Sequence, residues 1–179
     1  DRTMFYEVSG VPDVRLNGNV KNGGPSSFSQ ADVDQVQSET SPISLDVSWS
    51  DLGSERKIIV KVNTVGDKPT GDFTLQTVII EKLVILPAPA ANGEKEFPNV
   101  MRQMLPDVNG QAITLADKGN SVIQEYTYSE DASLQLDKLE VIAFVQNNDT
   151  KEVLNIGSTF DPAIITHNRP TTVVKNLAA

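Results

Sequence analysis

The chain has 179 residues, of which 39% are hydrophobic and 22% charged, and this length and composition suit one globular domain plus a further segment rather than wholesale disorder. Its net charge of −9 argues against nucleic acid or an anionic membrane surface as partner, because no evident cationic surface is present to replace phosphate counterions. It contains no cysteine, which excludes a disulfide, a thiolate nucleophile and a cysteine zinc site within these residues.

Residues 1–41 have a pattern of their own. Val14 and Leu16 alternate with polar residues before an Asn-Gly pair, which predicts a short strand ending in a tight turn. Residues 21–27 are expected to form a loop. Ser29 and Asp32 then have capping-box spacing, so a helix is predicted near residues 30–40, and Pro42 prevents its continuation.

The segment from Tyr6 to Gly18, followed by a helix, resembles the second half of a thioredoxin fold. In that fold the proline at the position of Pro12 is cis, so the resemblance predicts a cis Val11–Pro12 bond and makes residues 1–41 a partial thioredoxin-like segment. The half of the fold that carries the CxxC motif is missing here. An ordinary X-Pro loop, strand and helix accounts for the same residues equally well.

Residues 42–158 read as a series of strands. In the first strand, apolar residues alternate with polar ones, which indicates one buried face and places the tryptophan in the core. The apolar residues are Ile43, Leu45, Val47 and Trp49. Residues 57–64 repeat the pattern, and residues 122–128 form another strand. The long apolar run over residues 73–86 predicts a strand with a bulge or bend.

Residues 97–105 are predicted to form a short helix. Pro106 ends the predicted helix, and the apolar residues before it have a one-sided helical spacing. These residues are Val100, Met101, Met104 and Leu105.

Residues 138–157 predict a hairpin at the centre of the domain. Leu139, Val141, Ala143 and Val145 share one face of its first strand, while Ile142 and Phe144 lie on the other. A strand that is apolar on both faces is covered on both sides, so Phe144 is expected to be buried. With turn formers at residues 147–150 and several short strands before it, residues 42–158 predict an antiparallel β-sandwich.

Residues 159–179 lose this alternation and are expected to form an exit segment, either a further edge strand or a linker. No apolar run approaches the roughly 20 residues that a membrane-spanning helix needs. No signal peptide is visible at Asp1, so we expect a mature or fragmentary chain.

An ordered set of segments resembles the outer membrane protein 28-related family: FPNVMRQMLP at residues 97–106, a turn at 107–110, VIAFVQ at 141–146 and TKEVL at 150–154. The resemblance implies a thioredoxin-like domain followed by an immunoglobulin-like β-sandwich. It also implies export to the outer membrane or cell surface, as a lipoprotein or as type IX secretion cargo. The missing CxxC half removes any redox role from these residues.

Few residues suggest chemistry. Glu130, Asp131 and Asp137 are weak calcium candidates, although acidic loops are more often only solvated. The single histidine, His167, has no partner motif. Trp49 with Tyr126 and Tyr128 matches a sugar platform, but the strand alternation favours a core tryptophan. No catalytic residue, cofactor or catalytic metal is predicted.

These observations predict a non-catalytic, secreted or cell-surface binding or adhesion module. Its expected partners are surface or extracellular proteins or glycans, and its edge strands allow self-association. The alternative is an accessory domain of an extracytoplasmic thioredoxin-like thiol-disulfide protein whose redox half is absent. A hydrolase that uses acidic loop residues ranks last.

Overall fold

The computed structural model of the protein describes residues 2–160. Its N-terminal part contains two helices, one 3-10 helix and two short strands: α1 (Arg2–Phe5), β1 (Val14–Leu16), β2 (Lys21–Gly23), η1 (Pro25–Ser27) and α2 (Gln30–Ser38). The part that follows is built mainly of strands: β3 (Ile43–Asp51), β4 (Glu55–Thr64), β5 (Phe73–Ile85), β6 (Glu96–Leu105), β7 (Gln111–Ile113), β8 (Ser121–Ser129), η2 (Leu136–Lys138), β9 (Leu139–Asn147) and β10 (Val153–Ser158).

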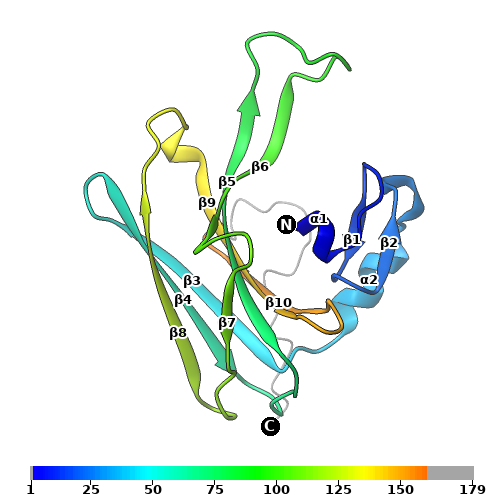
Figure 1. Cartoon of the computed structure of the whole chain (residues 1–179), viewed down its shortest axis with the longest axis vertical. Coiled ribbons are helices and arrows are strands. Elements are labelled where there is room, and N and C mark those ends of the chain that lie inside the picture. The colour runs from blue at the N-terminus through cyan, green and yellow to red at the C-terminus, as the bar shows by residue number, and fades with distance from the viewer. Residues whose placement is uncertain (1, 161–179) are drawn as a thin grey trace.

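Within the described residues, β3 to β10 form two antiparallel sheets that pack face to face (Figure 1). One sheet has the order β3-β4-β8, and the other has the order β10-β9-β5-β6 with β7 paired to the start of β5. The predicted antiparallel β-sandwich is therefore confirmed. The immunoglobulin-like strand order stays a prediction.

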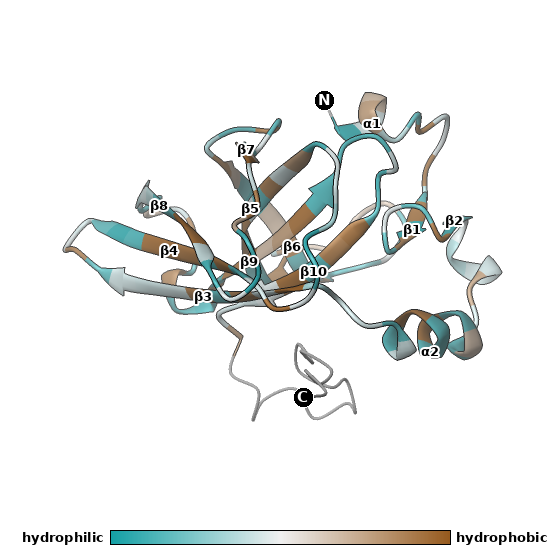
Figure 2. Ribbon diagram, turned by 90° about the horizontal axis from the view of Figure 1, so that it is seen from below, coloured by the Kyte–Doolittle hydropathy of each residue, from teal (hydrophilic) through white to brown (hydrophobic). Residues whose placement is uncertain are grey.

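The core lies between the two sheets and follows from the alternation of side chains along each strand. Ile58, Val60 and Val62 of β4 point into it, opposite the apolar face of β9 that begins at Leu139. Hydrophobic residues gather along the strands of the sandwich, whereas α2 mixes both kinds (Figure 2). Since β9 has β5 on one side and β10 on the other, the hairpin predicted over residues 138–157 supplies a central strand.

The two sheets meet along one side, where β10 lies against β3. The Asn155 amide donates to the carbonyl oxygen of Ile43 at 2.7 Å. A Cβ atom on Gly157 would lie 2.8 Å from the backbone oxygen of Leu45, so a glycine is needed for this close approach. One long side of the sandwich is therefore closed by backbone proximity.

Residues 97–105 form strand β6, so the predicted helix is wrong. Phe97 pairs with Val84 and Leu105 pairs with Thr77, so this segment runs alongside β5 from Thr77 to Ile85. The backbone N–H and C=O groups on that edge of β5 require partners, and this requirement outweighs a helical spacing of four apolar residues.

The bulge predicted for the long strand is present, but the extra residue belongs to its partner. The register between β5 and β6 shifts between Ile79 and Ile80, because Ile79 pairs with Gln103 and Ile80 with Met101. Arg102 is therefore the extra residue, and the bulge turns its side chain toward Glu81 on β5.

In the N-terminal part, β1 and β2 pair only with each other, in a small antiparallel sheet. Residues 21–27, predicted as a loop, instead form β2 and η1, because Lys21 continues the hairpin opposite Leu16. The turn between the strands has φ of 50° at Asn17 and 81° at Gly18, as its Asn-Gly sequence predicts. The Val11–Pro12 bond is cis. The thioredoxin-like origin of residues 1–41 stays a prediction.

Helix α2 begins with the predicted capping box. The Asp32 backbone N–H bonds the Ser29 hydroxyl oxygen, and the Asp32 carboxylate accepts from the Ser29 backbone N–H. Lys21 Nζ also donates to the Asp32 carboxylate at 2.7 Å. The hydrogen bonds from Lys21 and Ser29 lower the pKa of Asp32 from 3.8 to about 2, and the bond from Lys21 contributes most.

This lowered pKa predicts a pH dependence for the start of α2. Because the folded-state pKa lies below the unfolded value, the stabilisation is present above about pH 4 and is lost as the pH falls through about 2. An NMR titration of the Asp32 carboxyl group should show a midpoint near 2 in the native chain and a higher one in Lys21→Met. Lys57→Met, which removes a lysine paired with Glu125, is the control and should leave the Asp32 midpoint unchanged.

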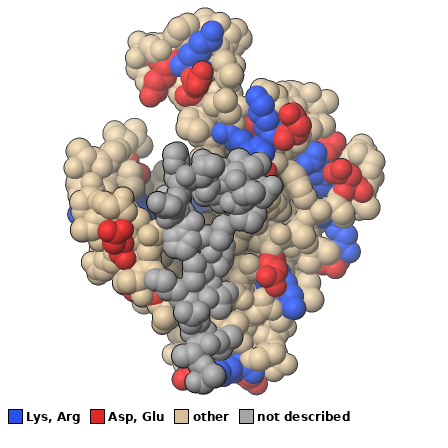
Figure 3. All heavy atoms as spheres, turned by 180° about the vertical axis from the view of Figure 1, so that it is seen from behind, with Lys and Arg blue, Asp and Glu red and all other residues tan. Residues whose placement is uncertain are grey.

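The visible charged surface is mixed. Lysine and arginine lie beside aspartate and glutamate on the face shown in Figure 3, and pairs such as Lys82 with Glu140 at 2.9 Å cross between strands. Among the described residues, none of the helices has the length and apolar character needed to cross a membrane.

Candidate functional site

The N-terminal segment docks on the β9–β10 hairpin through the turn that follows β1. The Val153 backbone N–H donates to the Asn17 carbonyl oxygen at 3.0 Å, and the Asn19 amide donates to the Thr150 carbonyl oxygen at 2.9 Å. A Cβ atom on Gly18 would lie 1.9 Å from the Lys151 carbonyl oxygen. The turn therefore touches the hairpin backbone directly, and only glycine allows this contact.

Gln146, a fully buried residue of β9, joins this hairpin to helix α1. Its Nε2 atom donates to the Tyr6 hydroxyl at 2.6 Å and to the Lys151 carbonyl oxygen at 2.7 Å. Its Oε1 atom accepts from Arg2 at 2.6 Å. Because both ends of the amide are used, Gln146 anchors α1 on the outer face of the five-stranded sheet.

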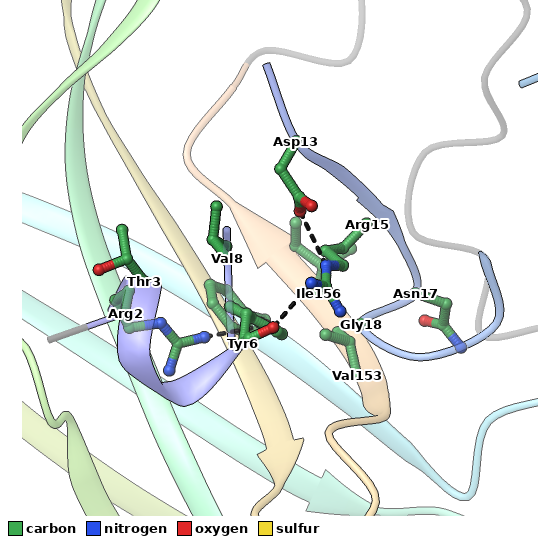
Figure 4. A pocket seen from close by; sticks show the side chains of 11 residues that line it. Arg2, Thr3, Tyr6, Val8, Asp13, Arg15, Asn17, Gly18, Val153 and Ile156 are labelled. Carbon is green, nitrogen blue, oxygen red and sulfur yellow. Dashed lines mark hydrogen bonds and ion pairs between the residues drawn. The ribbon is translucent and has the colours of Figure 1, made fainter. Parts of the chain in front are cut away.

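Tyr6 lies between two guanidinium groups (Figure 4). Arg2 donates to its hydroxyl at 2.9 Å, and the Arg2 Cζ atom stands 4.9 Å from the ring centroid. Arg15 donates to the Tyr6 carbonyl oxygen at 2.7 Å and to the Asp13 carboxylate at 2.8 Å. These contacts hold both arginines in place beside the hairpin.

Between this segment and the hairpin lies a cleft of about 490 Å³, which we call the hairpin cleft (Figure 4). Val153 and Ile156 of β10 with Phe144 of β9 form its apolar floor, and Arg2, Tyr6, Asp13 and Arg15 contribute polar groups. Phe144 is half-buried, not buried as predicted, because the N-terminal segment covers only part of this face.

The hairpin cleft combines an apolar floor with a small excess of positive charge. Among the described residues, its lining includes Arg2 and Arg15 but only one carboxylate, that of Asp13, in a chain whose net charge is −9. An apolar group that carries a negative charge fits this combination, since the floor removes apolar surface from water and a guanidinium attracts the anion.

The aromatic residues named from the sequence belong to the sandwich. Trp49 is half-buried against the core, with the Arg56 guanidinium 4.1 Å from its ring centroid. Tyr128 is buried in the core, and burial raises the pKa of Tyr126. These contacts give each ring a packing role and do not assemble an open sugar platform.

The three weak calcium candidates have other partners or lie apart. The Glu130 carboxylate accepts from Arg56 at 2.5 Å, and the Asp131 carboxylate accepts from the Ser133 backbone N–H at 2.9 Å. Hydrogen bonds from Ser133 lower the pKa of Asp131, while Asp137 lies in η2. Over residues 2–160, no group of three or more His, Cys, Asp or Glu side chains is placed to hold a metal ion. His167 lies outside the described residues.

Apart from Phe144, which was predicted as a core residue, the residues that line the hairpin cleft were not singled out from the sequence. One signal was available: Gln146, which holds Arg2 and Tyr6 beside the cleft, follows the apolar run of residues 141–145, and a buried amide requires partners. These partners, Arg2 and Tyr6, lie 144 and 140 positions away in the sequence, and no local pattern reveals them.

One solved structure with a TM-score above 0.5 supports the fold. HBP35 of Porphyromonas gingivalis is 15% identical, with a TM-score of 0.67 over 96% of this chain and 60% of that chain. A domain of the outer membrane lipoprotein Omp28 from the same organism is 13% identical, with a TM-score of 0.46 over 67% of this chain and 88% of that domain. This chain thus spans 60% of the length of HBP35.

The search of curated proteins found no match. The family model described as Outer membrane protein Omp28 matches residues 3–160, nearly all of the described chain. This match confirms the resemblance stated from the sequence, and with it the location at the outer membrane or cell surface. The chain belongs to the Omp28 family of outer membrane proteins.

Proposed function

We propose that this chain is a non-catalytic adhesion module that holds another surface protein through the hairpin cleft. The observation that carries the proposal is the meeting of an apolar floor, formed by β9 and β10, with the guanidinium groups of Arg2 and Arg15. The matching partner is a peptide segment that presents an apolar side chain next to an acidic one.

The bonding within the hairpin cleft favours binding over chemistry. Arg15 is engaged with Asp13, and Arg2 with Tyr6 and Gln146, so these groups support one another. Groups held in this way present a preformed surface, which reduces the ordering cost of association. This engagement supports a binding role more than a reaction centre.

A peptide-display selection on the purified chain tests the proposal, and the binding of each selected peptide to Ile156→Glu is then measured. Ile156 is 46% exposed on the cleft floor, so a carboxylate there repels an acidic partner without opening the core. The selected peptides should pair an aromatic or aliphatic residue with Asp or Glu, and Ile156→Glu should weaken their binding about tenfold or more.

The control is Ile123→Glu, which alters an isoleucine that is 55% exposed on β8 in the other sheet. It should bind the selected peptides as the native chain does. Failure to enrich any peptide, or enrichment of peptides that bind Ile156→Glu equally well, would remove the hairpin cleft as the binding site.

A further inference from the structure

Strand β8 forms one edge of the three-stranded sheet, because β4 lies on one side of it and none of the described strands pairs with the other side (Figure 1). It pairs with β4 along its whole length, from Ser121 to Ser129, without a register shift. It contains no proline, and its one charged residue is Glu125. β8 is therefore a long and regular edge strand.

The other long edges of the sandwich are protected, as far as the structure describes the chain. β10 lies against β3, where the Asn155 amide bonds the Ile43 carbonyl oxygen. β6 carries two features that oppose strand pairing, which are Pro98 and the extra residue Arg102 at its bulge. Proteins commonly use such features to prevent edge-to-edge association. Because β8 has neither of them, its edge is suited to pairing with another strand.

The hydrogen bonds at the two ends of β8 show which of its backbone groups point outward. The Thr64 N–H donates to the Asn120 carbonyl oxygen, and the Glu130 N–H donates to the Ser54 carbonyl oxygen, each at 3.0 Å. Both pairs extend the β4–β8 register by one residue. Since bonded and unbonded pairs alternate in an antiparallel ladder, the even-numbered residues of β8 bond β4. The residues whose N–H and C=O groups point away from β4 are Ser121, Ile123, Glu125, Thr127 and Ser129.

These outward backbone groups have no hydrogen-bond partner within residues 2–160. The side chains of the same residues lie on the solvent face, where Ile123 is 55% exposed. β8 is also rich in β-branched and aromatic residues, which favour the extended conformation. A strand added to this edge would satisfy the outward groups and cover Ile123.

We propose that a second copy of this chain pairs antiparallel with β8 around a twofold axis near Gln124, which joins the three-stranded sheets of the two copies into one continuous sheet. A second β8 is a matching partner, because its own outward N–H and C=O groups alternate with the same period. A twofold contact of this kind uses the same surface on both copies and closes with two chains, so neither copy keeps an open β8 edge.

The charges on the solvent face favour this register. An axis at Glu125 would place two glutamates opposite each other, which is destabilising. With the axis near Gln124, Glu125 of one copy instead faces Ile123 of the other, and the neighbour of Ile123 on β4 is the exposed Lys61.

The same register gives Lys61 an acidic neighbour. Within one chain Glu125 pairs with Lys57, whereas Lys61 has no ion pair among the described residues. Glu125 of the second copy would lie two strand spacings, about 10 Å, from the Lys61 backbone, and a lysine and a glutamate side chain together span this gap. The charges of two copies are therefore complementary across the β8 edge.

This pairing surface lies on the sheet opposite the one that carries the hairpin cleft, and it does not depend on the function proposed for that cleft. Loss of pairing should therefore leave peptide binding at the hairpin cleft unchanged. The two proposals can fail separately.

Sedimentation equilibrium of the native chain between about 1 and 500 µM tests the proposal and should show a dimer that dissociates on dilution. Hydrogen exchange identifies the surface. The outward N–H groups of Ile123 and Glu125 should exchange more slowly as the dimer fraction rises, because they then donate to the second copy.

A charge exchange tests the register. Glu125→Lys and Lys61→Glu should each weaken dimerisation about tenfold or more, because like charges then meet at both ends of the contact. An equimolar mixture of the two variants should recover the native affinity, since every contact again joins a lysine to a glutamate. Glu96→Lys, at an exposed glutamate on β6, is the matched control and should dimerise as the native chain does.

Three results would overturn the proposal. The first is a chain that stays monomeric over the whole concentration range. The second is a dimer in which exchange at Ile123 and Glu125 is unchanged. The third is a mixture of Glu125→Lys and Lys61→Glu that associates no better than either variant alone. Because both substitutions replace exposed side chains, recovery in the mixture also shows that the two variants are folded.

Discussion

Arg102→Met should lower the free energy of unfolding by about 3–5 kcal/mol, because it leaves a buried carboxylate without its partner. The Glu81 side chain is 3% exposed, and it accepts from Arg102 Nε at 2.9 Å and from Arg102 Nη2 at 2.5 Å. Methionine keeps much of the side-chain volume but removes every donor. Urea unfolding of the two chains measures the difference.

Two further variants separate charge from packing. In Arg102→Met with Glu81→Gln, the buried negative charge is gone, so most of the lost stability should return. Lys57→Met breaks an ion pair whose side chains are 38% and 55% exposed, and should cost less than about 1 kcal/mol. A loss in Arg102→Met that the second substitution leaves unchanged would show that packing at the bulge, and not the ion pair, stabilises the strands.

Gly18→Ala should release the N-terminal segment from the β9–β10 hairpin, at a cost of about 2–5 kcal/mol. Two effects add: the residue has φ of 81°, and a Cβ atom would lie 1.9 Å from the Lys151 carbonyl oxygen. The Val153 N–H, which donates to the Asn17 carbonyl oxygen, reports the docking. Its hydrogen exchange should be about 30-fold faster or more in the variant.

Gly53→Ala is the matched control, because Gly53 has φ of 86° and no atom within 4 Å of the added Cβ. It should incur only the backbone cost of about 1–2 kcal/mol and leave the Val153 exchange rate unchanged. Equal exchange rates in native chain and Gly18→Ala would mean that the turn can move away from the hairpin without undocking.

The strands of the sandwich were predictable because their signal is local. In β4, Ile58, Val60 and Val62 alternate with more exposed residues, and a period of two admits a half-buried strand and no helix. The start of α2 was predictable for the same reason, since the Ser29 and Asp32 side chains each bond the other's backbone N–H within one turn.

The conformation of β6 and the burial of Phe144 could not be predicted from local sequence patterns. The apolar spacing of residues 97–105 suits a helix by itself, and the free edge of β5 made it a strand. The two-sided apolar pattern of β9 correctly indicated a central strand. How fully Phe144 is covered depended on where the N-terminal segment docks.

By itself the amino-acid sequence determined the antiparallel sandwich, the capped helix, the Asn17–Gly18 turn and, through an ordered set of short segments, the family. Only the tertiary structure decided which groups meet at the hairpin cleft. The reason is physical: side-chain alternation and capping arise between residues a few positions apart. Gln146 and Tyr6 lie 140 positions apart in the sequence and are brought together only by folding.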